Sequence, residues 1–111
     1  MTQDSSIGVL AVYGPEGSRL WPMIFSQVDG EWWTATSRQH TDDFIHADHV
    51  DILLMDDTFA NTRVSGTLEE SRAPDDRRRL WGIQSPYLAR WCDGVEDPNL
   101  VVLKVHPLTT T

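Results

Sequence analysis

Short runs of β-branched and aromatic residues alternate with polar stretches along the chain and predict strands joined by tight turns. The expected strands cover residues 7–13, 19–28, 31–36, 50–55, 63–70 and 99–105. Residues 14–17 (GPEG) predict a turn after the first strand, and Asp29-Gly30 predict a two-residue hairpin after the second. Pro22 places its part of the second strand at an edge or a bulge, because proline cannot donate to a ladder. Gly66 suggests a bulge in the fifth strand.

Three segments interrupt this strand pattern and predict helices. Residues 37–48 begin with a serine suited to an N-cap and carry acids early, where the helix dipole favours them. Pro74 near a first turn predicts a helix over about 75–84, and Ser85-Pro86 predict the start of another over 87–92. Strands in this order with short helices between them predict a mainly β fold, either a small barrel or an α+β sandwich.

Charge and composition narrow the partners of this chain. Its 111 residues suit one domain, 1–111, with a core at about 7–107. The net charge of −8, with Lys104 as the only lysine, argues against nucleic acid as a partner. The run Arg77–Arg79 follows two aspartates and predicts a solvated helix face. No apolar run approaches the ~18 residues of a membrane span, so no membrane partner is expected. The lone Cys92 and the absence of a signal-peptide pattern favour a cytoplasmic location.

The chain has many tryptophans for its length, and each has two interpretations. They are Trp21, Trp32, Trp33, Trp81 and Trp91. Rings of this size either stack on a flat ligand or pack in a core or a subunit interface. Packing is favoured for Trp32 and Trp33, whereas stacking and packing stay equally open for Trp21 and Trp91.

Residue types that ligate metals or act as nucleophiles are present without the spacing that their chemistry needs. Histidines and aspartates gather at His40, Asp42, Asp43, His46, Asp48 and His49. None of them forms a recognised metal-binding spacing, so a solvated polar helix is favoured and no metal site is predicted. Cys92 has no predictable activating partner and is expected to pack. No catalytic residue is predicted.

Four motifs together carry a resemblance to a known family. They are Trp21-Pro22-Met23 in the second strand, Thr36-Ser37-Arg38 after the third, VSGTL at 64–68, and a tail over 81–105. The tail reads W-x9-W-x-D-G-x2-D-P-N-L-V-V-L-K-V. Over residues 7–107 the chain resembles the general stress protein branch of the split barrels related to pyridoxamine 5'-phosphate oxidase.

The resemblance implies a six-stranded Greek-key split barrel that forms a homodimer and binds flavin mononucleotide (FMN) in a groove between subunits. It would place Pro22 and Met23, with Trp21 before them, at the flavin ring edge. It would place Thr36, Ser37 and Arg38 at the phosphate, and Trp81 and Trp91 near the partner's groove. A role as a flavin-dependent oxidoreductase is the function that this implies.

Two positions depart from the family pattern. Trp21 stands where the family usually has an arginine, and Thr41 or Asp42 stands where it has a phosphate-binding lysine. A second hypothesis is therefore a cofactor-free dimer of the same fold that acts as a binding or interaction module. An unrelated small β-barrel is the third.

Overall fold

The computed structural model describes residues 3–14, 17–41, 47, 49–55, 58 and 60–107. These described residues form six strands and two helices. They are β1 (Gln3–Gly14), β2 (Gly17–Val28), β3 (Glu31–Ser37), α1 (Arg38–Thr41), β4 (Val50–Met55), β5 (Asn61–Ser71), α2 (Pro74–Leu88) and β6 (Leu100–Pro107). All six predicted strands are present. No described helix is long and apolar enough to cross a membrane.

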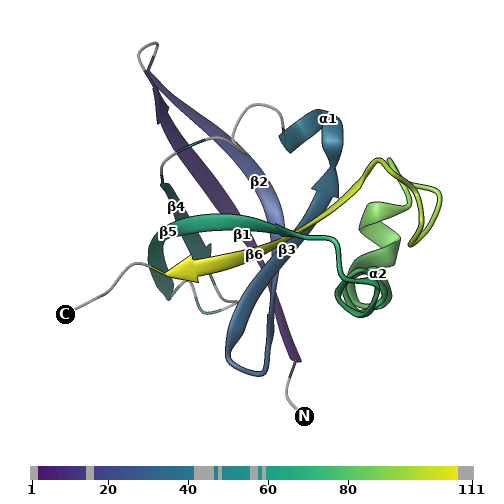
Figure 1. Cartoon of the computed structure of the whole chain (residues 1–111). Coiled ribbons are helices and arrows are strands. Elements are labelled where there is room, and N and C mark those ends of the chain that lie inside the picture. Colours follow the sequence, from purple (N-terminus) through teal and green to yellow (C-terminus); the bar gives the residue numbers. More distant parts are fainter. Residues whose placement is uncertain are drawn as a thin grey trace.

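The six strands close into one antiparallel barrel in the order β1-β2-β3-β6-β5-β4 (Figure 1). The first three strands follow one another as hairpins. β4 then returns to pair with β1, which closes the barrel, and β6 fills the place between β3 and β5. Closure leaves every strand with a neighbour on both sides over part of its length. The predicted barrel is confirmed, and the alternative sandwich is wrong.

Local turn chemistry explains the first hairpins. Asp29 and Gly30 have φ values of 53° and 84°, the left-handed pair that a tight hairpin with right-handed twist requires. Pro22 pairs only with Val9 of β1, because the ladder between β2 and β3 starts at Phe25. The register is continuous there, so Pro22 marks an edge and no bulge.

Gly66 has a different role from the predicted bulge. It pairs with Val50 of β4 and with Pro107 of β6, and both registers run through it without interruption. A Cβ at this position would collide with the carbonyl oxygen of His106. Glycine is needed because two backbones approach closely where β5 leaves β4 for β6.

Two apolar clusters hold the barrel and its helix together. The cluster inside the barrel contains Leu10, Met23, Phe25, Val50, Ile52, Leu54, Val101, Leu103 and Val105. The cluster between the barrel and α2 contains Val28, Trp33, Ala35, Leu80, Leu88, Cys92, Leu100 and Val102. Alternate residues of β6 thus enter the two clusters, which explains why its sequence is apolar on both faces.

A single helix, α2, replaces the two helices predicted between residues 75 and 92. Pro86 lies inside its last turns, and the chain leaves the helix at Ala89. Leu80, Gln84 and Leu88 form its buried stripe, spaced four residues apart. Gln84 Nε2 donates to Ser26 Oγ at 2.9 Å, which ties the helix to β2. Figure 1 shows α2 outside the barrel, beside β3 and β6. Of the helix predicted over 37–48, α1 is present, and residues 42–46 and 48 lie outside the described residues.

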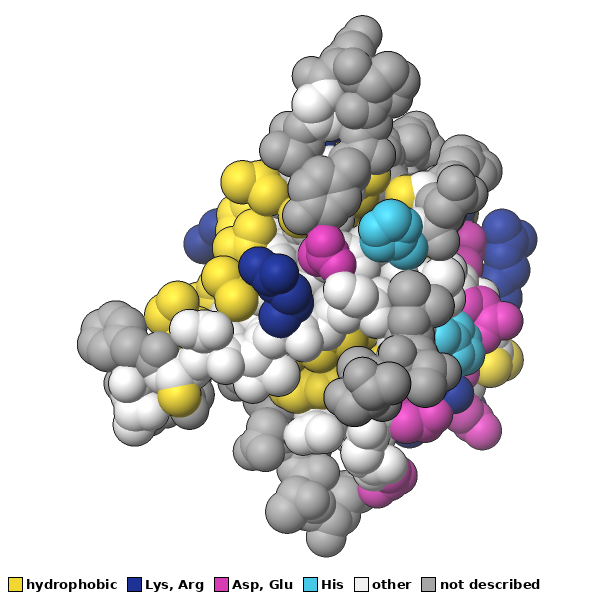
Figure 2. All heavy atoms as spheres, turned by 90° about the vertical axis from the view of Figure 1, so that its left-hand side faces the viewer, with side chains coloured by type: hydrophobic (Ala, Val, Ile, Leu, Met, Phe, Trp, Pro, Cys, Tyr) yellow, Lys and Arg dark blue, Asp and Glu magenta, His cyan; other side chains and the backbone are white. Residues whose placement is uncertain are grey.

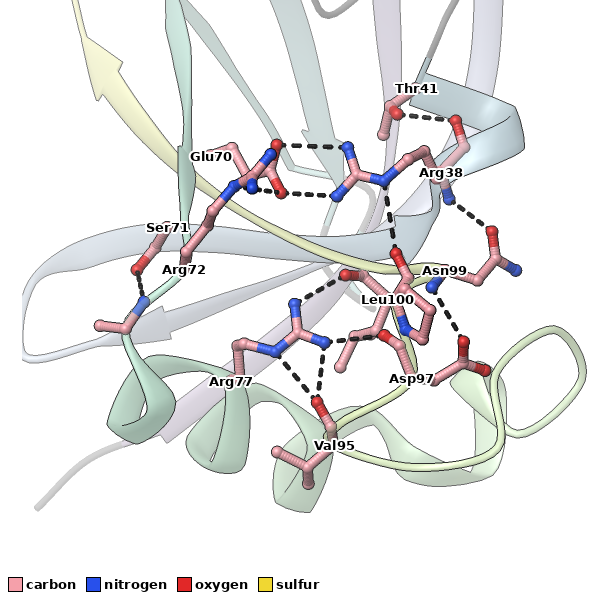
Figure 3. A network of polar contacts seen from close by, with 12 residues as sticks. Arg38, Thr41, Glu70, Ser71, Arg72, Arg77, Val95, Asp97, Asn99 and Leu100 are labelled. Atoms are coloured by element: carbon pink, nitrogen blue, oxygen red, sulfur yellow. Dashed lines mark hydrogen bonds and ion pairs between the residues drawn. The ribbon is translucent and has the colours of Figure 1, made fainter.

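The predicted solvated face at Arg77–Arg79 is wrong for its first member. Arg77 donates four hydrogen bonds of 2.7–3.0 Å to the carbonyl oxygens of Val95, Asp97 and Leu100. Figure 3 shows its guanidinium turned toward the loop that leads into β6. A planar fork of donors suits such a set of carbonyls. Arg77 therefore fastens this loop to α2.

Candidate ligand-binding pocket

A pocket of about 420 Å³ lies where the part of β2 before Phe25 meets α1 and the end of α2. Its lining consists of Ile7, Trp21, Pro22, Met23, Ile24, Thr36, His40, Tyr87 and Trp91. This volume falls in the range of small-molecule sites, about 300–1,000 Å³. The walls are mostly apolar or aromatic, and no Asp, Glu, Lys or Arg is among the described residues that line the pocket.

The edge of β2 forms one wall of the pocket. Successive side chains of a strand point to opposite faces, so Met23 enters the barrel core while Pro22 and Ile24 face outward. Ile7 lies opposite Ile24 in the β1 ladder and extends this wall. The pocket is open here because β3 pairs with β2 only from Phe25 onward.

Three aromatic rings form the opposite wall. Tyr87 and Trp91 meet edge to face with their centroids 4.7 Å apart, and Trp91 meets His40 in the same way at 5.3 Å. Asn99 Nδ2 donates to the carbonyl oxygen of Trp91 at 3.0 Å and holds this turn in place. Burial raises the pKa of the Tyr87 phenol, so it stays a neutral hydrogen-bond donor.

His40 forms the polar edge of the pocket together with two hydroxyl groups. Its Nδ1 lies 2.8 Å from Ser37 Oγ and 3.3 Å from Thr36 Oγ1. Both hydroxyl-bearing residues are almost fully buried. The short α1 helix brings His40 back over the end of β3. Its Nδ1 therefore lies within hydrogen-bond distance of the hydroxyls of both Thr36 and Ser37.

Arg38 points away from this pocket. Its guanidinium forms a two-point ion pair with Glu70 on β5, with the shorter contact at 2.7 Å, and also donates to the carbonyl of Pro98 (Figure 3). Its backbone N–H faces the carbonyl and the side-chain oxygen of Asn99, at 2.7 and 3.1 Å. The hydrogen bond from Arg38 holds the pKa of Glu70 below its ordinary range. Arg38 lines a second groove, together with Glu70 and Arg72.

The structure brings together five of the eight residues predicted for the cofactor site. Trp21, Pro22, Met23, Thr36 and Trp91 line the pocket. Ser37 contributes through its contact with His40, whereas Arg38 and Trp81 lie outside the lining. Trp81 packs against the cluster under α2.

Sequence reasoning did not assign His40 or Tyr87 to this site. A signal for Tyr87 was present in its spacing, because it lies four residues before Trp91 in the helix predicted over 87–92. Among the described residues no cluster of three or more His, Cys, Asp or Glu could hold a metal ion. Of the residues weighed as ligands, Asp42, Asp43, His46 and Asp48 lie outside the described part of the chain.

The pocket fits the ring of a flavin better than its phosphate. Aromatic and apolar walls suit a flat heterocycle. The hydroxyls of Thr36 and Ser37 face His40, and the guanidinium of Arg38 faces Glu70. Lys104 is ion-paired with Glu31 at 2.6 Å on another side of the barrel. The groups expected at the phosphate are thus engaged with other partners.

Solved structures with the same fold include general stress proteins and a flavin-binding protein. The general stress protein 26 of Bacillus anthracis str. Sterne is 24% identical, with a TM-score of 0.75 over 94% of this chain and 81% of that chain. A protein from Clostridium acetobutylicum, related to general stress protein 26 and described as of the pyridoxinephosphate oxidase family, is 21% identical, with a TM-score of 0.68 over 92% and 75%. A FAD-binding protein from Mesorhizobium loti is 14% identical, with a TM-score of 0.71 over 98% and 95%.

No protein-family model matches this sequence, and no curated protein matches it. The structural neighbours support the resemblance to the general stress protein branch that the motifs predicted. The split-barrel fold, which solved proteins of the pyridoxamine 5'-phosphate oxidase type share, is confirmed, and the hypothesis of a barrel of a different fold is wrong.

Proposed function

We propose that this chain is a flavin-binding split-barrel protein of the oxidoreductase type, which holds the flat flavin ring in the pocket between β2, α1 and α2. The observation that carries the proposal is the meeting of Trp21-Pro22-Met23, Thr36 and Trp91 in one cavity. These residues come from three separate motifs of the resemblance. The FAD-binding neighbour from Mesorhizobium loti lends further support.

The protein contributes position and environment to this function, while a bound flavin supplies the redox chemistry. Pro22 and Ile24 exclude water from one side, and Trp91 lies on the other. His40 and Tyr87 are placed to form hydrogen bonds with carbonyl and nitrogen atoms of the ring. We assign no residue as a general base.

A titration with riboflavin, followed by quenching of its fluorescence, tests the proposal. We expect saturable binding that Trp91→Ala weakens by about tenfold or more, since loss of one aromatic wall removes stacking and burial. Trp81→Ala is the matched control, because Trp81 is a tryptophan of the same helical region outside the lining. Folded protein that binds no riboflavin at millimolar concentration contradicts the proposal.

A homodimer is the second part of the proposal. Ile7, Leu20, Leu53 and Met55 are large apolar side chains that are 71%, 64%, 38% and 42% exposed. They lie on β1, β2 and β4, which are neighbours in the barrel. Figure 2 shows a band of hydrophobic side chains on this side of the molecule. Contiguous apolar surface of this kind marks interaction sites, and Ile7 also lines the pocket, so a second copy would help to close it.

Sedimentation equilibrium tests the dimer. We expect a dimer that Ile7→Lys converts to monomer, because the charge would be buried without a partner. Glu96→Lys, an exposed site away from this surface, is the control and should leave the dimer intact. A monomeric wild-type protein contradicts this part. A cytoplasmic location, expected from the single cysteine, belongs to the same proposal.

The alternative is a cofactor-free binding module of the same fold. The ion pair of Arg38 with Glu70 favours it, because that arginine is where the resemblance places a phosphate ligand. The riboflavin titration separates the two functions: a folded dimer that binds no flavin ring supports the module.

A further inference from the structure

The expected phosphate end of the pocket lacks positive charge among the described residues. Thr36, Ser37 and Arg38 would have to supply the donors there. The two hydroxyls lie within 2.8–3.3 Å of His40 Nδ1. Arg38 directs its side chain to Glu70 and its backbone N–H to Asn99. A phosphate in this place would have to break contacts that the fold already makes.

Turning Arg38 toward a bound phosphate would break its ion pair with Glu70. If Arg38 turned toward the pocket, Glu70 would lose its two-point partner while remaining largely buried, with its side chain 16% exposed. Arg72 also approaches this carboxylate, but only at 3.6 Å and from an exposed position. Leaving a buried carboxylate without its main partner is unfavourable. The pair therefore opposes recruitment of Arg38 by an anionic ligand.

The charge of the whole chain acts in the same direction. A phosphate monoester carries about −1.5 to −2 charges at neutral pH. The chain has a net charge of −8, so its field repels such a ligand at low ionic strength. An uncharged ring does not meet this repulsion, and its polar atoms cost less to desolvate in an apolar pocket than the charges of a phosphate. Of the polar side chains that line the pocket, His40 and Tyr87 suit neutral carbonyl and ring nitrogen atoms.

We propose that this pocket selects an uncharged flat heterocycle, a flavin ring without its phosphate, over the phosphorylated cofactor. The inference rests on the proposed function, since it concerns which form of the ring the same pocket takes. It also accounts for the departures from the family pattern at Trp21 and at Thr41 or Asp42. Trp21 stands in place of the arginine of the family pattern, and Thr41 or Asp42 stands in place of its phosphate-binding lysine.

The decisive measurement compares riboflavin with FMN on the wild-type protein by fluorescence quenching at two salt concentrations. We expect FMN to bind about fivefold more weakly than riboflavin at 20 mM NaCl, the effect of roughly one unfavourable charge contact. At 300 mM NaCl the FMN affinity should rise, since salt screens repulsion. The riboflavin affinity should stay constant.

A pair of variants tests whether charge in the pocket sets this preference. His40→Lys places an ammonium group in the lining and releases the hydroxyls of Thr36 and Ser37. We expect it to reverse the preference, so that FMN binds more tightly than riboflavin. His40→Gln is the matched control without charge, and it should keep riboflavin ahead of FMN even if both bind more weakly. Circular dichroism checks that each variant is folded, and the wild-type comparison decides the question if the lysine variant does not fold.

Each outcome has one meaning. Tighter binding of FMN than of riboflavin by the wild type, or FMN binding that weakens with salt, overturns the inference and leaves the proposed function standing. No binding of either ligand by folded protein overturns the proposed function itself. Binding of riboflavin ahead of FMN, with the expected salt response, supports both.

Discussion

Removing Arg77 should destabilise the protein far more than removing the arginine beside it. Arg77 donates to three carbonyl oxygens of the loop before β6, at 2.7–3.0 Å. Arg77→Ala leaves these carbonyls without that donor, and each lost contact in a partly buried site costs about 1 kcal/mol net. The free energy of unfolding should therefore fall by about 3 kcal/mol. For a chain of this length that corresponds to a decrease in Tm of about 12 °C.

Arg78→Ala provides the matched control for this prediction. Arg78 is the next residue of α2, its side chain is 63% exposed, and among the described residues its ion pair is with Asp75 on the same helix surface. Exposed pairs of this kind contribute less than about 1 kcal/mol. Arg77→Lys should lie between the two, because one ammonium group cannot reach three carbonyls at once.

Urea denaturation followed by circular dichroism measures all three variants, with unchanged m values as the check for two-state unfolding. Equal loss of stability in Arg77→Ala and Arg78→Ala would refute the reasoning, since it would mean that the loop is held without the guanidinium. The loop itself can be followed at the Asp97 carboxyl. This group accepts hydrogen bonds from the backbone N–H groups of Asp93 and Asn99, and these bonds depend on the folded loop.

Three further predictions concern the barrel and its ion pair. Gly66→Ala should lower stability by about 2 kcal/mol or more, because its Cβ would meet the backbone of β6, while Gly82→Ala, with open space around it, should raise stability by about 0.5–1 kcal/mol in the same urea assay. The lowered pKa of Glu70 means that its pair with Arg38 stabilises the fold above pH 4.5 and is lost as pH falls through the folded pKa. Urea midpoints between pH 3 and 7 should thus fall more steeply for wild type than for Glu70→Gln, and parallel curves would contradict this. Burial raises the pKa of the Cys92 thiol, so a thiol reagent should react with it only after unfolding, and rapid labelling of native protein would show that Cys92 is accessible.

Much of the fold could be predicted because its signals are local. The alternation of apolar residues, the Asp29-Gly30 hairpin and the proline at an edge of β2 each depend on neighbours within a few positions. Their predictions are confirmed in the structure. The tail over 81–105 supported the split barrel through its resemblance to a known family. Its motif is continuous in sequence and spans one helix, one loop and one strand.

The misassigned details involve contacts over long sequence distances. Ser85-Pro86 suggested a new helix, but the packing of Leu88 under the barrel continues α2 through the proline. Gly66 suggested a bulge, whereas the approach of His106 on β6 explains it. In each case a partner tens of residues away overrode the local preference.

The sequence by itself determined the strands, their turns and the set of aromatic residues available for a flat ligand. Only the tertiary structure decided where charged groups point. Arg38 and Arg77 each lie near the start of a predicted helix, and the sequence does not distinguish their roles. In the structure Arg38 pairs with Glu70, whereas Arg77 holds the loop before β6. Local patterns are set by the backbone and its immediate neighbours, but the partner of a long charged side chain depends on which distant residues the closed barrel brings within reach.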